Sequence, residues 1–468
     1  MHGAAGHGFH PSILREYDIR GVVGKTLSPS DALALGRTLG SIVVSRGGSI
    51  ACVGYDGRMS SPVLEEELAR GLASTGLHVL RLGLCSTPAL YFASKVLHAN
   101  CGVMVTGSHN PPEYNGFKMM TDGKPFFGAD IQALGNAASK GNWVEGAGSI
   151  LEVEALDAYI SRLLKDYTAK RGLKVAWDAG NGAAGEAMLK LAQQLPGEHV
   201  LLNEKIDGTF PAHHPDPTIE ANLEQLRDTV LGEGCDMGVA FDGDGDRIGV
   251  IDEQGRVIWG DQILAMLAGD VLARIPGASI LADVKASQML FDEVERLGGN
   301  PVMCQTDHSL IKTRMIELAA PLAGEMSGHI FFADTYFGFD DVLYAAVRLI
   351  DLVARGDKSI GDMRDALPQM VNTPEIRIDV AEERKAAVVD AVKQSLLAAG
   401  AEVNDIDGVR VSRDGGWWLL RASNTQSALV VRCEAPGEDA LEDLKAEVIA
   451  ELNKAGLAVD RLEPSAGH

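Results

Sequence analysis

Residues 50–83, IACVGYDGRMSSPVLEEELARGLASTGLHVLRLG, decide the fold that we expect for this chain. An apolar run rich in β-forming residues ends at Asp56, and a polar turn follows it. Apolar residues then recur at helical spacing from Ser61 until Gly76, after which a second apolar run begins. Such a strand–helix–strand unit predicts two parallel strands with a right-handed crossover, and therefore an α/β domain.

The same pattern occurs twice more along the chain. The second copy covers 173–203 and the third 278–305, and their first strands end at Asp178 and Asp283. Successive copies are more than a hundred residues apart, which is the spacing of domains and not of a solenoid repeat. We therefore expect three related α/β domains.

The last hundred residues follow a different pattern. Short strands with a hairpin turn at Asp414-Gly415 precede a final amphipathic helix, which is typical of a small antiparallel α+β domain. The predicted fold class is thus α/β, with three related mixed-sheet α/β domains and a C-terminal α+β domain. The expected domains are 1–154, 155–256, 257–368 and 369–468.

Composition limits the possible partners of the chain. The formal net charge is −23, which argues against a general nucleic-acid or anionic-membrane surface, although a small anion could still bind where positive groups converge. The six cysteines are scattered without a C-x-x-C pair, so we expect neither a disulfide scaffold nor a zinc site. No apolar run suits a secretion signal or a membrane span, and we expect a cytoplasmic protein with no nucleic-acid or membrane partner.

One glycine pattern suggests an alternative function. Gly180, Gly182 and Gly185 follow a predicted strand and open a predicted helix, and Glu204 lies further along the chain. This spacing resembles a dinucleotide fingerprint and would indicate an NAD-dependent oxidoreductase. The simpler interpretation is a tight strand–helix turn that needs glycine for close packing.

The segment DGDGDR, residues 242–247, predicts a metal site. Asp242, Asp244 and Asp246 alternate with glycines directly after an apolar strand, so their carboxylates can converge on one cation. A site made only of oxygen ligands favours a hard ion, which here is Mg²⁺ in preference to Ca²⁺. The alternative is a solvated acidic turn.

The segment TGSHNPPEYNGFK, residues 106–118, offers a candidate nucleophile. Ser108 sits in a turn rich in Gly, Asn and Pro, where its hydroxyl can be exposed, although such a hydroxyl can equally cap the turn. His109 is adjacent to it, and Lys118 is a possible proton carrier or phosphate contact.

Two further loops carry polar side chains. The loop GEMSGH, 324–329, has a mixture suited to sugar hydroxyls, and RASNTQ, 421–426, has donors suited to a phosphate. Neither is specific by itself, because one could be a polar turn and the other a hairpin connection. The candidate binding residues are Glu325, Ser327 and His329 in the first loop and Arg421, Ser423, Asn424 and Thr425 in the second.

Taken together, these four segments make the chain resemble the α-D-phosphohexomutase superfamily over nearly its whole length. The N-terminal LREYDIRG, residues 14–21, belongs to the same pattern. The form GEMSGH, together with VKAS, HSLIK and FGFDD, is similar to the bacterial bifunctional phosphomannomutase/phosphoglucomutase branch. The resemblance implies four domains around one central cleft, and it makes the glycine triplet a structural turn.

The resemblance also implies an activity, in which hexose 1-phosphate and hexose 6-phosphate are interconverted through a phosphoserine enzyme and a hexose 1,6-bisphosphate. The sugar would be glucose, mannose or both, with one Mg²⁺ per chain and glucose 1,6-bisphosphate as activator. The alternatives are a phosphoglucosamine mutase, a non-catalytic sugar-phosphate binder and the NAD-dependent oxidoreductase. We expect a monomer, with a dimer as the alternative, and small hexose phosphates as its partners.

The site residues that the resemblance implies fall into three groups. Ser108 would carry the phosphoryl group and would hold Mg²⁺ together with the three aspartates. Lys118 and Arg247 would serve proton transfer or charge stabilisation, with His109 close enough to assist. Further residues expected to bind substrate are Tyr17, Arg20, Lys285, His308 and His329, beside Glu325, Ser327, Arg421, Ser423, Asn424 and Thr425.

Three positions depart from the pattern of the branch, namely Gln262, Asp307 and Gln426. Gln262 stands where a basic residue is expected, and Gln426 where a small hydroxyl residue is more usual. Asp307 stands where glycine is usual, and its carboxylate would either raise the pKa of His308 and weaken phosphate contact or turn outward. These departures bear on substrate preference and rate, and leave the reaction class unchanged.

Overall fold

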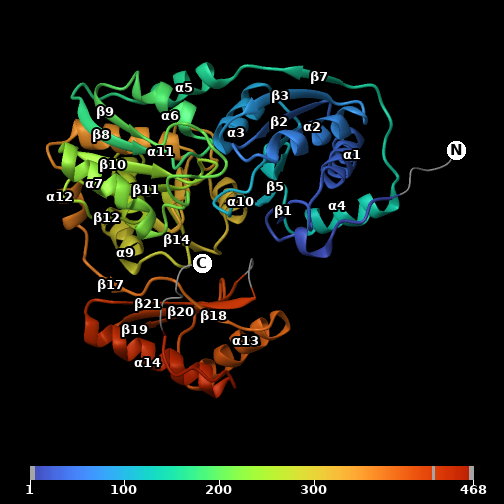
Figure 1. The fold of residues 1–468 in the computed structure, drawn as a ribbon. Coiled ribbons are helices and arrows are strands. Elements are labelled where there is room, and N and C mark those ends of the chain that lie inside the picture. Colours follow the sequence, from blue (N-terminus) through green and yellow to red (C-terminus); the bar gives the residue numbers. More distant parts are fainter. Residues whose placement is uncertain (1–5, 424–426, 463–468) are drawn as a thin grey trace.

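The structure is a computed structural model that describes residues 6–423 and 427–462. Figure 1 shows three α/β units in the upper part of the molecule and the C-terminal unit below them. Each of the three strand–helix–strand copies lies in a sheet of its own, and its two strands are parallel as predicted: β2 with β3, β8 with β9, and β13 with β14. The predicted α/β fold class is therefore confirmed.

The first sheet has the order β1-β5-β4-β2-β3-β7, with β6 paired to β5. Strands β2, β3, β4 and β7 are parallel, and β5 is antiparallel to both of its neighbours. The elements of this unit are η1 (Pro11–Ile13), β1 (Ile19–Val22), α1 (Pro29–Ser45), β2 (Ile50–Tyr55), α2 (Ser61–Ala73), β3 (His78–Leu84), α3 (Thr87–Val96), β4 (Cys101–Val105), β5 (Tyr114–Thr121), β6 (Lys124–Pro125), α4 (Ala129–Lys140) and β7 (Ser149–Glu152).

The second sheet has the order β12-β11-β10-β8-β9. Strand β10 is parallel to β8 and antiparallel to β11, so this sheet is also mixed. The elements of the unit are α5 (Leu156–Leu164), β8 (Leu173–Asp178), α6 (Gly185–Ala192), β9 (Gly197–Leu202), η2 (Glu220–Leu223), α7 (Glu224–Glu233), β10 (Met237–Phe241), β11 (Ile248–Asp252) and β12 (Val257–Ile258).

The third sheet has the order β14-β13-β15-β16, in which only the last strand, β16, is antiparallel. The elements of the unit are α8 (Gly260–Arg274), β13 (Ser279–Asp283), α9 (Gln288–Arg296), β14 (Asn300–Cys304), α10 (His308–Leu318), β15 (Leu322–Gly324), β16 (Ile330–Phe332), α11 (Val342–Arg355) and α12 (Ile360–Asp365).

The C-terminal sheet is antiparallel, with the order β17-β21-β20-β19 and with β18 paired to β21. The predicted hairpin turn joins β19 to β20, since Arg413 pairs with Gly416 across Asp414-Gly415. The elements of this unit are β17 (Val371–Asn372), β18 (Ile376–Asp379), α13 (Glu382–Ala398), β19 (Val409–Arg413), β20 (Gly416–Ala422), β21 (Ala428–Ala435) and α14 (Glu438–Lys454).

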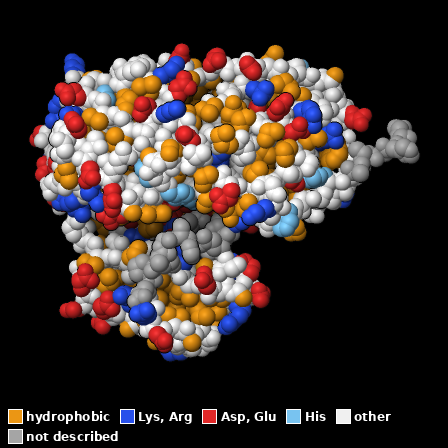
Figure 2. All heavy atoms as spheres, in the orientation of Figure 1, with side chains coloured by type: hydrophobic (Ala, Val, Ile, Leu, Met, Phe, Trp, Pro, Cys, Tyr) orange, Lys and Arg blue, Asp and Glu red, His pale blue; other side chains and the backbone are white. Residues whose placement is uncertain are grey.

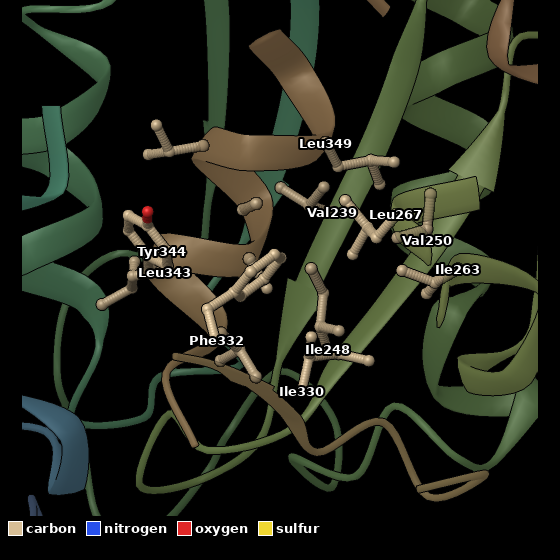
Figure 3. Close-up of a cluster of buried hydrophobic side chains, with 14 of the residues drawn as sticks. Val239, Ile248, Val250, Ile263, Leu267, Ile330, Phe332, Leu343, Tyr344 and Leu349 are labelled. Carbon is tan, nitrogen blue, oxygen red and sulfur yellow. The ribbon is translucent and has the colours of Figure 1, made fainter. Parts of the chain in front are cut away.

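The second and third units share one hydrophobic core. Helix α11 is buried along nearly its whole length, because it packs between elements of both units. Figure 3 shows Leu349 of this helix beside Val239 of the second sheet and Leu267 of α8. Burial of so much apolar surface holds the two units in one fixed arrangement.

The first three motif loops occupy equivalent places in the fold. In each of the first three units, the loop connects a strand parallel to the first strand of the repeat (β4, β10 or β15) with an antiparallel partner (β5, β11 or β16). The fourth loop connects β20 and β21. Each of the first three loops therefore leaves the carboxyl end of a strand, where α/β sheets commonly bind their ligands.

Figure 2 shows how charged side chains are distributed over one face of the molecule. Lys and Arg side chains are scattered among Asp and Glu there, and they form no continuous patch on that face. Among the described helices, none is long and apolar enough to cross a membrane.

Candidate active site

Ser108 lies in the connection between β4 and β5, with its hydroxyl directed at the loop of the second unit. Its φ of 50° is in the left-handed region, where a non-glycine residue is uncommon and often marks a functional site. The Ser108 Oγ donates to Asp242 Oδ2 at 3.1 Å and lies 3.2 Å from His109 Nδ1. Only 2% of Ser108 is exposed, so the hydroxyl is held in a buried, polar position.

Asp56 and Arg58 fix the shape of this loop. The Asp56 carboxylate accepts the Thr106 hydroxyl at 2.8 Å and the Gly107 N–H at 3.1 Å. Arg58 is fully buried, and its guanidinium donates to four carbonyl oxygens of the loop, including that of Ser108 at 2.6 Å. Sequence reasoning noted Asp56 only as the end of a strand and missed Arg58, although the segment YDGR contained both.

The three aspartates of the 242–247 loop converge as predicted. One carboxylate oxygen from each lies within 4.8 Å of the others, and all three side chains are fully buried. Asp242 Oδ1 accepts the N–H groups of Gly245, Asp246 and Arg247, so the loop is folded around this oxygen. This arrangement rules out the solvated acidic turn.

Lys118 and Thr87 of the first unit contact the same aspartates. Lys118 Nζ donates to Asp244 Oδ2 at 2.7 Å and also to Asp246, and the Thr87 hydroxyl donates to Asp244 Oδ2 at 2.5 Å. The second oxygens of Asp244 and Asp246 have no hydrogen-bond partner among the described residues. The loop therefore presents buried, unsatisfied oxygens, which suit a hard divalent cation.

The electrostatics of the cluster show an excess of negative charge. Burial, and then the neighbouring Asp246 and Asp244 carboxylates, raise the pKa of Asp242 well above its usual range. Although burial opposes its charge, Asp244 and Asp246 hold the pKa of Lys118 well above its ordinary value. One ammonium thus faces three carboxyl groups, and a cation would relieve their mutual repulsion.

Arg247 and His329 join the second loop to the third. Arg247 Nε donates to His329 Nε2 at 3.1 Å, and the other ring nitrogen of His329 is Nδ1. That nitrogen lies 3.2 Å from Asp340 Oδ2. The His308 ring stacks on His329 with a centroid distance of 5.4 Å. Both predicted histidines therefore lie beside the aspartate loop.

Two neighbours of the histidines were not predicted. Asp340 is fully buried, and its Oδ1 accepts from Lys312 Nζ at 2.9 Å. Asp340 lies in FGFDD and Lys312 in HSLIK, two of the segments on which the family resemblance rests. Neither residue was given a role there. Burial, followed by the charge of Lys312, lowers the pKa of His308 well below its usual value, and this ring is neutral.

The third loop is held by the strand-end acid of its own unit. Asp283 Oδ1 accepts the Met326 N–H at 3.1 Å, which fixes the loop between Glu325 and Ser327. Glu325 is buried, and burial raises its pKa. Lys285 Nζ lies 3.1 Å from Glu375 Oε2 in the C-terminal unit.

The predicted phosphate loop is described only in part. Arg421 Nε donates to Asp407 Oδ2 at 3.0 Å, and that oxygen also accepts the Thr306 N–H of the third unit at 3.1 Å. Ser423 is buried beside Arg421. Asn424, Thr425 and Gln426 lie outside the described residues.

Arg20 and Tyr17, the two candidate substrate-binding residues near the N-terminus, have different neighbours. Arg20 donates to Asn110 Oδ1 at 2.6 Å and also pairs with Asp18, so it lies against the Ser108 loop. Burial raises the pKa of Tyr17, with the charges of Asp307 and Arg421 acting on its hydroxyl as well. Tyr17 is therefore close to the third and fourth units.

Comparison with known proteins decides the family. Phosphoglucomutase/phosphomannomutase alpha/beta/alpha domains I, II and III match residues 11–144, 157–255 and 259–371, and the C-terminal domain of the same family matches 375–451. The chain belongs to the phosphoglucomutase/phosphomannomutase family. It is a hexose-phosphate mutase, an enzyme of the isomerase class.

Individual relatives agree with this assignment. The chain is 44% identical over 434 residues to a phosphomannomutase/phosphoglucomutase of Pseudomonas aeruginosa, covering 93% of this chain and 94% of that protein. It is 40% identical over 437 residues to a phosphoglucomutase of Neisseria gonorrhoeae, covering 92% and 95%. The crystal structure of a phosphoglucomutase/phosphomannomutase family protein from Burkholderia thailandensis superposes with a TM-score of 0.92 at 39% identity, covering 97% of this chain and all of that one.

Within this mutase, the glycine triplet is a structural turn. A Cβ atom on Gly182 would lie 2.9 Å from the Gly243 carbonyl oxygen, and one on Gly185 would lie 2.1 Å from that of Glu204. Backbone therefore fills the space that a dinucleotide would need above these glycines. The oxidoreductase alternative is wrong.

Asp307 behaves differently from both of the outcomes considered for it. Its carboxylate is buried and caps helix α10, because Oδ1 accepts the N–H groups of Ser309 at 2.7 Å and Leu310 at 2.9 Å. It neither turns outward nor raises the pKa of His308, which is lowered. Gln262 likewise serves its own helix, since its carbonyl oxygen accepts the Trp259 N–H at 3.1 Å.

Proposed function

We propose that this enzyme interconverts the 1-phosphates and 6-phosphates of glucose and mannose through phosphorylated Ser108. The observation that carries the proposal is the position of the Ser108 Oγ, 3.1 Å from Asp242 Oδ2 and beside the other two aspartates. A nucleophile placed against a cation-binding cluster, with a lysine and an arginine at its side, suits phosphoryl transfer. The choice of sugars is supported by the relatives described above, whose names are phosphomannomutase/phosphoglucomutase and phosphoglucomutase.

Asp242, Asp244 and Asp246 are the residues that would hold Mg²⁺, together with the phosphoryl oxygens on Ser108. The unsatisfied oxygens of Asp244 and Asp246 and the purely oxygen donor set fit this ion. When bound, Mg²⁺ would neutralise negative charge on the phosphoryl group in transfer.

The residues around Ser108 divide the remaining work. Burial, followed by the charge of Arg247, lowers the pKa of His109 well below its usual value, so its neutral ring can accept a proton 3.2 Å from the Oγ. Although burial opposes it, Asp216 and the metal-loop aspartates raise the pKa of Arg247, which stays charged and stabilises the phosphoryl oxygens. Lys118 remains an ammonium and can donate a proton to the sugar oxygen that leaves.

The substrate would be held at both ends. Glu325 and Ser327 suit sugar hydroxyls, and His329 lies between them and the aspartate loop. The phosphate that is not being transferred would meet the cationic and hydroxyl groups of the first, third and fourth units. We assign to this role Tyr17, Arg20, Lys285, His308, Arg421, Ser423, Asn424 and Thr425. Closure of the C-terminal unit over the bound sugar would exclude water, which would otherwise hydrolyse phosphoserine.

A coupled assay tests the proposal. Glucose 1-phosphate, mannose 1-phosphate and glucosamine 1-phosphate are offered separately, with Mg²⁺ and trace glucose 1,6-bisphosphate as activator, to the wild type and to Ser108→Ala. We expect turnover of the first two sugars and its collapse in the variant. Retained turnover in Ser108→Ala, or none with any sugar in a folded, phosphorylated wild type, would refute the proposal.

Glucosamine phosphate is the alternative substrate, and the sugar loop tests it. Met326 lies between the two proposed sugar-binding residues, and its sulfur contacts Arg432 of the C-terminal unit. We expect Met326→Gln to change the ratio of activities among the three sugars. An unchanged ratio would mean that this loop does not select the sugar.

Three further expectations stay predictions. We propose a monomer in solution, which size-exclusion chromatography with light scattering would test, with a dimer as the contrary outcome. We propose a cytoplasmic location, testable by fractionation. The proposed domain limits, 1–154, 155–256, 257–368 and 369–468, would be tested by limited proteolysis.

A further inference from the structure

A cavity of about 270 Å³ lies between the first and third units, alongside helix α10. The helix contacts β6 of the first unit, and Figure 1 shows it between the first unit and the rest of the third. The cavity runs from His308 at the start of α10 to Ile316 and Ala319 near its end. From His308 to Ile316 the helix rises about 12 Å, so the lining extends over that length of α10.

The wall of the cavity is mainly apolar. Met119 and Met120 of β5, Met315 of α10, and Phe337 and Phe339 line it. Methionine side chains adapt their shape to a ligand, and aromatic rings provide flat contact area. A molecule of about ten non-hydrogen atoms would fill such a volume.

The lining includes three lysines, of which two are paired with buried carboxylates. Among the described residues that line the cavity, the ionisable side chains are Lys95, Lys118, Lys312, His308 and two tyrosines, and none is Asp or Glu. This is unexpected in a chain with a net charge of −23. Lys118 and Lys312 are paired with buried aspartates at the inner end. Lys95 is exposed at the outer end, and within the described ranges no ion pair is found for it.

The outer end also exposes apolar surface. Ile316 is 61% exposed, and the lining residues Ala319, Ala333 and Gly123 are exposed as well. An exposed aliphatic side chain and an unpaired lysine in the lining of one cavity suit a ligand with an apolar body and an anionic head.

From the apolar wall and the exposed, unpaired lysine in the lining, we propose that this cavity binds a small arylalkyl monocarboxylate. The carboxylate meets Lys95 at the outer end, and the aromatic body lies against the methionines and phenylalanines. At Tyr17, Lys118 and His308 the cavity borders the place proposed for hexose phosphate, whereas the exposed Lys95 and Ile316 belong to neither catalysis nor substrate binding there, and competition with hexose phosphate tests whether the two ligands bind independently. It does not rest on the proposed function, since binding is measured without turnover.

The probe is 3-phenylpropionate, with 3-phenylpropanamide as a neutral control of the same shape, titrated into the full-length protein by ligand-observed NMR. A ligand of this size is expected to bind in the millimolar range. We expect the amide to bind about fivefold more weakly, and Lys95→Gln to weaken the acid by a similar factor. Ile316→Glu places a negative charge in the lining and should weaken the acid more than the amide. Lys358→Gln, an exposed lysine elsewhere, should change neither.

Competition distinguishes this site from the active site. Saturating glucose 6-phosphate should leave 3-phenylpropionate bound. The proposal would be overturned if glucose 6-phosphate displaced 3-phenylpropionate, or if the acid and the amide bound equally well. It would also be overturned if Lys95→Gln and Ile316→Glu left binding of the acid unchanged, or if no binding were seen at ten times the expected concentration. The variants are surface changes at exposed positions, so the fold should be retained, and a thermal unfolding curve checks this.

Discussion

Lys118 Nζ lies 2.7 Å from Asp244 Oδ2, although the two residues belong to different sheets and are 126 positions apart. The ammonium thus occupies part of the oxygen cluster that is proposed to hold the metal. This contact couples the proton chemistry of the first unit to the cation site of the second.

Lys118→Met should tighten Mg²⁺ binding while it abolishes turnover. Removal of a positive charge next to two carboxylates lowers the repulsion on an incoming divalent cation, and we expect a decrease of about tenfold in the dissociation constant. Isothermal titration with Mg²⁺ at pH 8 measures it. Lys124→Met, at an exposed lysine of the same hairpin, should leave the constant unchanged. Weaker binding in Lys118→Met would contradict this account of the cluster.

Arg58→Met should destabilise the protein strongly. Both Arg58 and Asp56 are almost wholly buried, so the change leaves a carboxylate without its charge partner and four loop carbonyls without donors. The expected loss is about 3–5 kcal/mol in the free energy of unfolding, measured with urea. The matched control is Arg70→Met. Because the Arg70 guanidinium is exposed, this variant should lose less than about 1 kcal/mol in the free energy of unfolding.

The pair between Lys285 and Glu375 should make stability depend on pH. Lys285, acting against the effect of burial, lowers the pKa of Glu375 from 4.5 to about 2. Because the folded pKa is lowered, the pair stabilises the fold above pH 4.5 and loses this contribution as the pH falls towards 2. Glu375→Gln should therefore be less stable than the wild type at pH 7.

Urea unfolding at several values between pH 7 and pH 3 checks this dependence. The gap in free energy between wild type and Glu375→Gln should be constant above about pH 5 and should narrow below it. A gap that widens on acidification would show that the carboxylate is not stabilised by Lys285. Glu402→Gln, at an exposed position, serves as the control.

Asp307→Ala should cost about 1 kcal/mol of stability through loss of the cap on α10. Asp307→Asn keeps an oxygen that can accept the N–H groups of Ser309 and Leu310, so it should lose little. Burial, with Glu325 nearby, raises the pKa of Asp307 well above its usual range, and a neutral side chain is accordingly well tolerated there. Equal losses in the two variants would mean that the charge, and not the cap, is what matters.

Local pattern was sufficient for much of the architecture. Each strand–helix–strand unit was predictable because helical and strand periodicities are properties of neighbouring residues, and the hairpin at Asp414-Gly415 follows from turn chemistry. The family motifs identified Ser108 and the three aspartates as a group. Arg58, Lys312 and Asp340 were not identified, since their roles depend on partners far away in the sequence.

The sequence by itself therefore determined the fold class, the four motif loops and the class of reaction, because these rest on short segments with a specific order of residues. Tertiary structure alone decided that Lys118 pairs with Asp244, 126 positions away, and that Asp407 of the C-terminal unit accepts the Thr306 N–H of the third unit. It also decided that the second and third units share a core through α11. The physical reason is the same in each case: burial forces polar groups to find partners, and which partner lies within reach depends on how the units pack.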